Sequence, residues 1–513
     1  MWYHAKERGV SVSEGTVTSA GERSDHPADG WQIQSLVHSD AVGPNVLLVV
    51  FDTARADAFE PYGARPNSSP TVQQLASSGL AHQATFSTAC WTVPAHGSLF
   101  SGQLPRSAGL GHVGGQDPAG FRVAMHDLET DLLPHVLRDT GYATFGVSAN
   151  AWISPTSGFD TGFDTFRQLT GGRHVAFGSG GIRNRTRWML DALRARTDDG
   201  AEAVTRMLEE WLTSRDGRPF FLFVNLIECH SPYLPPKPWN DLAFWERFQA
   251  AREARRHLSL GELWKANVGG FDVPDAAIDR MRRSYAAAIR QLDNWLARVL
   301  ELLDREGLLA DTEVIVTSDH GENLGDGQRL GHAFSLDDRL IRLPFVASGP
   351  LDLDTPEVLS IADVPRMLAQ SLEIDSHPWS VGPGGGPAVA QFDAPGIAGD
   401  RRVGEALALW GLGEEAGHRL CASFTCATDG TLKLLRKPWG EELIDLASDP
   451  LEAQSTAVDA HVEAAHGVRL QALRSALDEA EASERTPPRA IERDDPVLAD
   501  DELEAQMRLL GYL

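Results

Sequence analysis

Two short stretches bring together residues that could bind a metal ion. Val314–Thr317 is an apolar run that leads into Asp319-His320-Gly321, and Asn45–Phe51 is a similar run that ends in Asp52. A carboxylate beside an imidazole suits a divalent cation. The alternative is that Asp319-His320-Gly321 is a turn that only ends a strand. Because both runs end in an acid, we expect the three side chains to share one cation.

A third stretch supplies a hydroxyl group. Thr92 lies two residues before Pro94, at the start of a segment, Thr92–Gly102, that has the pattern of a helix. A helix N-terminus carries free N–H groups and the positive end of the helix dipole, and both attract anions. Thr92 is therefore a candidate nucleophile, and the alternative is a helix N-cap residue.

The elements around these stretches predict an α/β fold. Unbroken apolar runs such as Asn45–Phe51 are typical of strands that are buried on both faces, and two more are expected at Gly141–Ser148 and Pro219–Ile227. Helices are expected at Ala201–Ser214 and, from an apolar stripe with spacings of three and four, at Asp275–Glu306. This alternation predicts a large, mostly parallel, doubly wound sheet flanked by helices. Its carboxyl edge is where ligands bind in such folds, and Asp52 and Asp319 would lie there.

These motifs, in their order along the chain, resemble the sulfatase family of the alkaline phosphatase superfamily. Each motif is weak alone, but five in the family's order are a strong signal, and they cover residues 44 to 455. The matching pieces are Asp52, Thr92-Val-Pro-Ala-His96 through Leu99–Gly102, Asn225–Tyr233, Ser318–Glu322 and Glu442–Glu452.

The resemblance implies a metal site and three catalytic histidines. His230 matches the histidine near the leaving group and is expected to be a general acid, the alternative being a loop histidine. His332 stands where many sulfatases place a lysine against the bound oxyanion, and His96 replaces an arginine. The implied cofactor is one divalent cation, Ca²⁺ or else Mn²⁺, Zn²⁺ or Mg²⁺, held by Asp52, Thr92, Asp319 and His320.

The sequence departs from the family at the nucleophile. The best-known sulfatases have there a cysteine that matures to formylglycine, whereas this chain has Thr92, and Cys90 lies two residues too early. Threonine cannot become formylglycine, and related phosphodiesterases and phosphotransferases use a metal-bound threonine. The resemblance therefore implies a metal-dependent hydrolase of sulfuric or phosphoric esters with a metal-bound Thr92 nucleophile. The alternatives are a phosphotransferase or phosphodiesterase of the same superfamily and a non-catalytic anion-binding protein.

Three further polar residues belong to the predicted site. Thr53 stands where the family often has a second metal ligand, so we expect a weak ligand or none. Asn150 is the nearest polar candidate for a contact with the sulfate, and otherwise a turn residue. Glu322 is expected to accept a hydrogen bond from His320 and so to support it as a ligand.

Composition limits the partners and the compartment. The formal net charge of −26 argues against a nucleic-acid backbone as partner, and no apolar run is long enough to span a bilayer. The N-terminus lacks the apolar core of a signal peptide and the four cysteines are sparse, so we expect a cytoplasmic protein. Its substrate would be a small-molecule, glycan-derived or lipid-derived sulfate or phosphate ester. The oligomeric state does not follow from the sequence.

Four segments are predicted along the chain. They are a disordered or loosely docked tail (1–43), a sulfatase-like catalytic domain (44–380), a small C-terminal α+β antiparallel subdomain (381–455) and a helical C-terminal tail (456–513). In the subdomain, short strands are expected at Leu420–Thr425, Leu432–Leu435 and Glu442–Leu446.

Overall fold

The computed structural model describes most of the chain between residues 43 and 485. The described residues are 43–111, 118–169, 189–190, 193–194, 198–374, 377, 379, 385–396 and 398–485. The predicted N-terminal tail, except for residue 43, and the end of the predicted C-terminal tail lie outside this range. No helix in the described part is long and apolar enough to cross a membrane.

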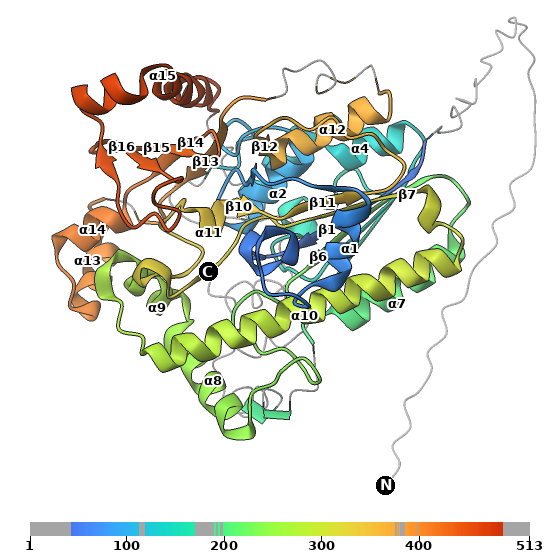
Figure 1. Cartoon of the computed structure of the whole chain (residues 1–513), viewed down its shortest axis with the longest axis horizontal. Helices are drawn as coiled ribbons and strands as arrows, with labels where there is room; N and C mark the ends of the chain where they lie inside the picture. Colours follow the sequence, from blue (N-terminus) through green and yellow to red (C-terminus); the bar gives the residue numbers. More distant parts are fainter. Residues whose placement is uncertain are drawn as a thin grey trace, which may run out of the picture. The chain divides into compact units, whose positions relative to one another are not determined.

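A seven-stranded sheet lies at the centre of the fold (Figure 1). Its order is β2 (Leu80–Ala81), β11 (Phe345–Ser348), β7 (Thr312–Thr317), β1 (Asn45–Phe51), β6 (Phe220–Leu226), β4 (Ala143–Ser148) and β5 (Thr165–Gln168). The five strands from β7 to β5 are parallel, while β11 runs antiparallel to both of its neighbours. The prediction of a mostly parallel α/β sheet is confirmed.

Helices cover both faces of this sheet because its central strands are apolar on both sides. In β1 the side chains alternate: Val49 and Phe51 join the core on one face, and Val46 and Leu48 join the core on the other. The first face is covered by α1 (Pro70–Ser78), α7 (Ala201–Ser214) and α10 (Asp275–Arg305). The second is covered by α2 (Thr92–Ser101), α3 (Pro118–Asp127), α4 (Leu133–Asp139) and α12 (Val364–Ser371).

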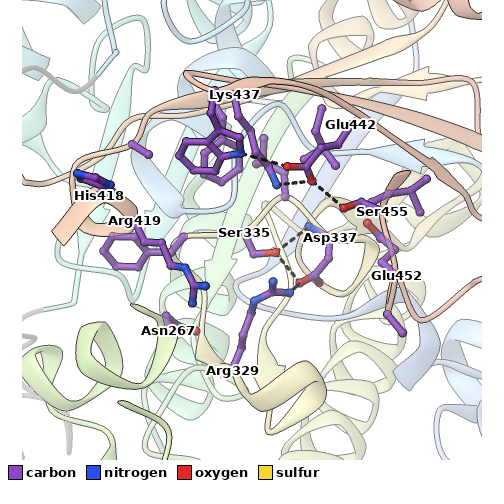
Figure 2. Close-up of a pocket in the computed structure, with 18 of the residues that line it drawn as sticks. Asn267, Arg329, Ser335, Asp337, His418, Arg419, Lys437, Glu442, Glu452 and Ser455 are labelled. Atoms are coloured by element: carbon purple, nitrogen blue, oxygen red, sulfur yellow. Dashed lines mark hydrogen bonds and ion pairs between the residues drawn. The ribbon is translucent and has the colours of Figure 1, made fainter. Parts of the chain in front are cut away.

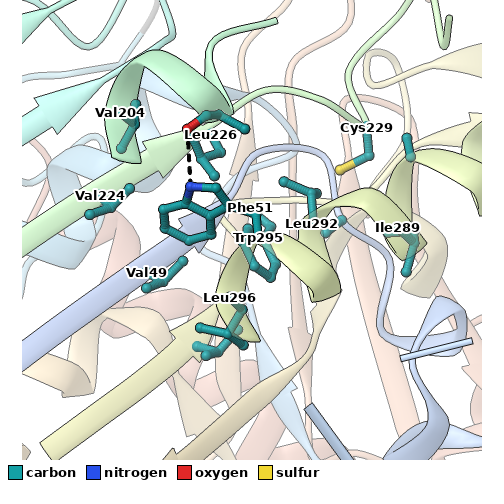
Figure 3. Packing of buried hydrophobic residues seen from close by; sticks show 14 of the residues in the cluster. Val49, Phe51, Val204, Val224, Leu226, Cys229, Ile289, Leu292, Trp295 and Leu296 are labelled. Carbon is teal, nitrogen blue, oxygen red and sulfur yellow. Dashed lines mark hydrogen bonds between the residues drawn. The ribbon is translucent and has the colours of Figure 1, made fainter. Parts of the chain in front are cut away.

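Helix α10 carries the apolar stripe that the sequence predicts and holds the carboxyl end of β1 in place. The indole of Trp295 packs edge-on against Phe51, with ring centroids 6.3 Å apart (Figure 3). Its Nε1 donates a hydrogen bond of 3.1 Å to the carbonyl oxygen of Ala201 at the start of α7. The strand that ends in Asp52 is thus fixed by packing just before it delivers its carboxylate.

A five-stranded antiparallel sheet forms the C-terminal part of the described chain. It consists, in order, of β13 (Ala388–Phe392), β14 (Phe424–Thr428), β15 (Leu432–Lys437), β16 (Gly440–Asp445) and β17 (Thr456–Ala457), with α15 (Ala460–Ala482) packed on it. The predicted strand at Leu420–Thr425 is wrong in its first four residues, since β14 begins at Phe424. Leu420 ends the helix α14 (Glu414–Leu420), because Ala416 and Leu420 are four residues apart and both are buried on one helix face.

Smaller elements fill the space around the edge of the large sheet where β1 and β7 end. The segment 236–272 forms α8 (Phe244–His257), α9 (Leu260–Lys265) and a π-helical turn (Ala266–Gly270). A three-stranded sheet contains β3 (Thr85–Phe86), β10 (Arg342–Leu343) and β12 (Leu359–Ser360), and α11 (Asp338–Ile341) precedes β10. A short hairpin pairs β8 (Asn323–Leu324) with β9 (Leu330–Gly331).

Candidate active site

Adjacent strands bring three candidate metal ligands together. Asp52 follows β1, and Asp319 and His320 follow β7, which pairs directly with β1 in parallel. One ligand atom from each of the three residues lies within 4.8 Å of the others, and all three residues are buried. In the described part of the chain, no other group of three histidine, cysteine or acidic side chains is arranged in this way.

The three side chains suit a divalent cation because two of their buried carboxylate oxygens have no hydrogen-bond partner. Oδ1 of Asp52 and Oδ2 of Asp319 are buried and accept no hydrogen bond. Burial raises the pKa of Asp52 to about 6, although a hydrogen bond from Asn150 opposes the change. Burial and the neighbouring Asp52 carboxylate also raise the pKa of Asp319 well above its usual value. Two buried carboxylates side by side are costly unless a cation lies between them.

His320 is held in the form that a metal ligand requires. Its Nδ1 lies 2.9 Å from the carbonyl oxygen of Gly321, which can only accept, so Nδ1 carries the proton and Nε2 has a free lone pair. Burial lowers the pKa of His320 well below its usual value, so the ring is neutral. Position 321 must be glycine, since a Cβ atom there would meet the carbonyl oxygen of Arg339 at 1.9 Å.

Thr92 lies beside this cluster at the start of α2. Its Oγ1 is 3.3 Å from Nε2 of His320, and the residue is 1% exposed. The N-cap residue of α2 is Trp91, and no side chain caps this helix end, so the alternative of Thr92 as an N-cap does not hold. Cys90 packs elsewhere, in an apolar cluster with Phe86 and Cys426, and burial raises the pKa of its thiol far above the ordinary value.

The loop after β1 turns Thr53 away from the cluster. Thr53 has a φ of 61°, its N–H donates to Oδ1 of Asp319 at 3.1 Å, and its hydroxyl donates to the carbonyl oxygen of Asp52. Tyr285 on α10 donates to the carbonyl oxygen of Thr53 at 2.8 Å and accepts from the N–H of Arg55. Tyr285 belongs to the buried apolar stripe of α10, and its phenol group is the only feature of the sequence that indicates this second role.

Asn150, two residues after the end of β4, contacts a carboxylate of the candidate metal site directly. Its Nδ2 donates to Oδ2 of Asp52 at 2.7 Å, and its Oδ1 accepts from the N–H of Trp152 at 2.8 Å. The bond occupies one oxygen of Asp52 and leaves Oδ1 directed to the candidate cation. The structure therefore gives Asn150 a role in orienting Asp52.

We predict that Asn150→Ala weakens binding of Mn²⁺ or Ca²⁺ about 10- to 100-fold, because an unrestrained Asp52 loses its orientation. Isothermal titration of the chelator-treated protein measures this. The matched control is Gln168→Ala, because Gln168 bonds to the carbonyl oxygen of Ala151 without touching Asp52. Equal affinities in wild type and Asn150→Ala contradict the assignment.

The β8–β9 hairpin places Glu322 against His332. Oε1 of Glu322 is 3.0 Å from Nδ1 of His332, whereas Nδ1 of His320 bonds to Gly321, so the predicted support of His320 by Glu322 is wrong. Burial disfavours the charged form of His332, but the Glu322 carboxylate outweighs it and raises the pKa of His332. The ring of His332 lies 4.5 Å from that of His320 and 5.1 Å from that of His230, centroid to centroid.

His230, which follows β6, and His332 are the most accessible members of the cluster. Nδ1 of His230 donates to the carbonyl oxygen of Ser231 at 2.9 Å, so Nδ1 carries a proton. His230 is 7% exposed and the side chain of His332 is 11% exposed, whereas Asp52, Thr92 and Asp319 are at most 1% exposed. The cluster is therefore most accessible from the side of these two histidines.

His96 lies on the inner side of the cluster. Its Nδ1 donates to the carbonyl oxygen of Thr92 at 3.0 Å and is 3.4 Å from Oδ2 of Asp319. Its ring packs edge-on against Phe159 and Phe223, its Nε2 has no partner, and burial lowers its pKa to about 4. All the predicted site residues thus gather in one place, and a direct chemical role for His96 stays a prediction.

Comparisons with known proteins all find similarity to sulfatases and related hydrolases. A model of the sulfatase family matches residues 44–364. A segment of 138 residues is 32% identical to the multifunctional alkaline phosphatase superfamily protein PehA of Trinickia caryophylli, covering 24% of this chain and 27% of PehA. The choline-sulfatase of Rhizobium meliloti is 23% identical over 448 residues, covering 81% of this chain and 82% of that protein. The phosphonate monoester hydrolase of Agrobacterium radiobacter has a similar structure (TM-score 0.58, 20% identity), covering 85% of this chain and 96% of that one.

Proposed function

Because the chain belongs to the sulfatase family, we propose that it hydrolyses sulfuric or phosphoric esters with Thr92 as the nucleophile and a divalent cation as cofactor. The observation that carries this proposal is the position of the Thr92 hydroxyl, 3.3 Å from Nε2 of His320. The same hydroxyl lies at the N-terminus of α2, where the helix dipole favours an incoming anion.

The metal site would consist of Asp52, Asp319, His320 and Thr92. Its oxygen and imidazole donors suit a hard or borderline divalent cation, and the unsatisfied oxygens of the two carboxylates are the observation that supports it. When bound, such a cation would polarise the ester and lower the pKa of the Thr92 hydroxyl.

The residues of the site would divide the reaction into two steps. In the first, Oγ1 of Thr92, which has released its proton to solvent, attacks the sulfur or phosphorus atom, the bond to the alcohol oxygen breaks, and His230 donates a proton to that oxygen. His332, whose charged form is favoured by the Glu322 carboxylate, binds the non-bridging oxygens. In the second, water attacks the same sulfur or phosphorus atom while His230 takes its proton, and the bond to Oγ1 breaks, which restores the deprotonated Thr92.

The identity of the nucleophile affects which esters are hydrolysed efficiently. A formylglycine hydrate releases sulfate by elimination across its own carbon, and this route is closed to threonine. The adduct on Thr92 must instead be cleaved by water at sulfur or phosphorus. We therefore expect phosphorus esters to be at least as good substrates as sulfate esters.

A substrate panel tests this expectation. The Mn²⁺-loaded protein is assayed with p-nitrophenyl sulfate, p-nitrophenyl phosphate, bis-p-nitrophenyl phosphate and p-nitrophenyl phenylphosphonate. At least one phosphorus ester is expected to reach a kcat/KM equal to or above that of the sulfate. Hydrolysis of the sulfate alone contradicts the proposed chemistry.

A further inference from the structure

A buried lysine links the C-terminal sheet to the segment that leads into α11. Lys433 lies on β15, and its side chain is completely buried. Its Nζ donates hydrogen bonds to Oδ1 of Asp338, to Oε1 of Glu452 and to the carbonyl oxygen of Leu336, at 2.5, 2.9 and 3.0 Å. Each of the three N–H groups of the ammonium therefore has an acceptor.

Lys433 carries its charge in this position. Burial alone would lower the pKa of Lys433, but the Asp338 and Glu452 carboxylates outweigh burial and raise this pKa above its ordinary value. Burial and the charge of Asp338 raise the pKa of Glu452, although Lys433 opposes this change. Because the loss of one partner leaves the other buried charges uncompensated, removal of the ammonium should disturb the positions of both carboxylates.

The same network fixes the position of α11, which has only four residues. The N–H of Asp338, the first residue of α11, donates to the same Oε1 of Glu452 at 2.5 Å. The preceding residue, Asp337, caps the helix and accepts hydrogen bonds from Arg329 and Ser335, as Figure 2 shows. A helix this short is not stable by itself, so its position depends on these contacts.

The helix α11 in turn holds the loop that carries two candidate metal ligands. The carbonyl oxygen of Leu340 accepts a hydrogen bond from the N–H of Gly321 at 2.7 Å. The carbonyl oxygen of Ile341 accepts from the N–H of Ser87 at 2.7 Å, and Oγ of Ser87 donates to the carbonyl oxygen of Asp319. The loop is therefore bonded to α11 twice, once directly and once through Ser87.

We propose that Lys433 is a positioning residue for the metal site and that it holds the loop of Asp319 and His320 in place through α11. This inference rests on the proposed function, because Asp319 and His320 are the ligands that the loop would supply to the cation. A displaced loop would still contain both ligands, but their atoms would no longer meet Asp52 in the geometry that a cation requires. The C-terminal sheet would thus support a site whose ligands follow strands of the large sheet.

Two measurements on the full-length protein test this inference, and neither depends on turnover. The first is hydrogen exchange of the metal-free protein, followed by mass spectrometry of the peptides that contain Gly321 and Ser87, whose N–H groups donate to α11. In Lys433→Met, which keeps most of the apolar length of the side chain, both amides are expected to exchange at least about tenfold faster. The second is titration calorimetry with Mn²⁺, in which the dissociation constant is expected to rise about 10- to 100-fold.

Arg106→Met is the matched control. Arg106 follows α2 and also pairs with the C-terminal part of the chain, with Asp393 at 2.8 Å and with Glu484 at 3.0 Å, but neither partner belongs to α11. Thermal unfolding should show a loss of stability in both variants, because each loses buried or half-buried ion pairs. Arg106→Met is nevertheless expected to keep the exchange of the two amides and the Mn²⁺ dissociation constant within about twofold of the wild type.

Unchanged exchange and Mn²⁺ affinity in Lys433→Met overturn the inference, and so do equal changes in Arg106→Met. Glu452→Ala is a second variant for the case that Lys433→Met does not fold, because Lys433 then keeps Asp338 as a partner while the N–H of Asp338 loses its acceptor. It is expected to change both readouts in the same direction, and wild-type values for both would also overturn the inference.

A failure of the proposed nucleophile would appear in a different experiment, as unchanged ester hydrolysis by Thr92→Ala. The exchange results would then remain as predicted, because they are measured without metal and without substrate.

Discussion

Asp319→Asn is expected to abolish binding of the divalent cation and to lower ester hydrolysis at least about 1,000-fold. Oδ1 of Asp319 accepts from the N–H groups of Thr53 and His320, at 3.1 and 2.8 Å, and the amide oxygen of asparagine can keep both bonds. Oδ2, which accepts no hydrogen bond, would become an NH₂ group that cannot bind a cation. The loops should therefore keep their shape while the site loses its charge.

Elemental mass spectrometry of the dialysed protein measures the metal occupancy of the variant directly. Asp57→Asn is the matched control, because Asp57 is an exposed carboxylate that pairs with Arg55 away from the cluster. It is expected to keep both metal and activity within about twofold, as for other exposed ion pairs. Full occupancy in Asp319→Asn contradicts the metal site.

Thr92→Ala is expected to lower kcat at least about 1,000-fold, because it removes the group that forms the covalent bond. Thr92→Ser keeps a hydroxyl at the start of α2 and should retain a measurable part of the activity. Cys90→Ala should retain nearly all of it, since the Cys90 side chain packs with Phe86 and Cys426 in a separate apolar cluster. Steady-state kinetics on the best ester of the panel separates the three variants.

Loss of activity in Cys90→Ala with normal activity in Thr92→Ala would move the nucleophile to the cysteine. Metal titration provides a second readout for Thr92→Ala. This variant should still bind the cation through Asp52, Asp319 and His320, with reduced affinity.

The parts of the fold that the sequence predicts well are those with a strong local pattern. The β1 strand and the α10 helix were predicted within two residues of their ends, because each buries a continuous apolar run or stripe. Asp52 and Asp319 could be placed together for the same reason. Asp52 directly follows β1, and Asp319 is separated from the end of β7 by one residue. Parallel neighbouring strands end at the same edge of the sheet.

The parts that the sequence does not predict depend on contacts between distant segments. Glu322 meets His332 because of a hairpin whose strands have only two residues each, too short for any periodic signal. Asn150 reaches Asp52 because β6 alone separates β4 from β1, and this strand order is not the order in the sequence. These are tertiary contacts, and they decide which polar side chain supports which ligand.

The most direct test of the account is to identify the residue that carries the covalent adduct. The wild-type protein is quenched with acid during turnover of the best phosphorus or sulfate ester, and intact-protein and peptide mass spectrometry locate the added group. The account predicts one phosphoryl, phosphonyl or sulfuryl group on Thr92, absent from Thr92→Ala and from the protein without substrate. An adduct on another residue, or an aldehyde at Cys90 with unmodified Thr92, would contradict it.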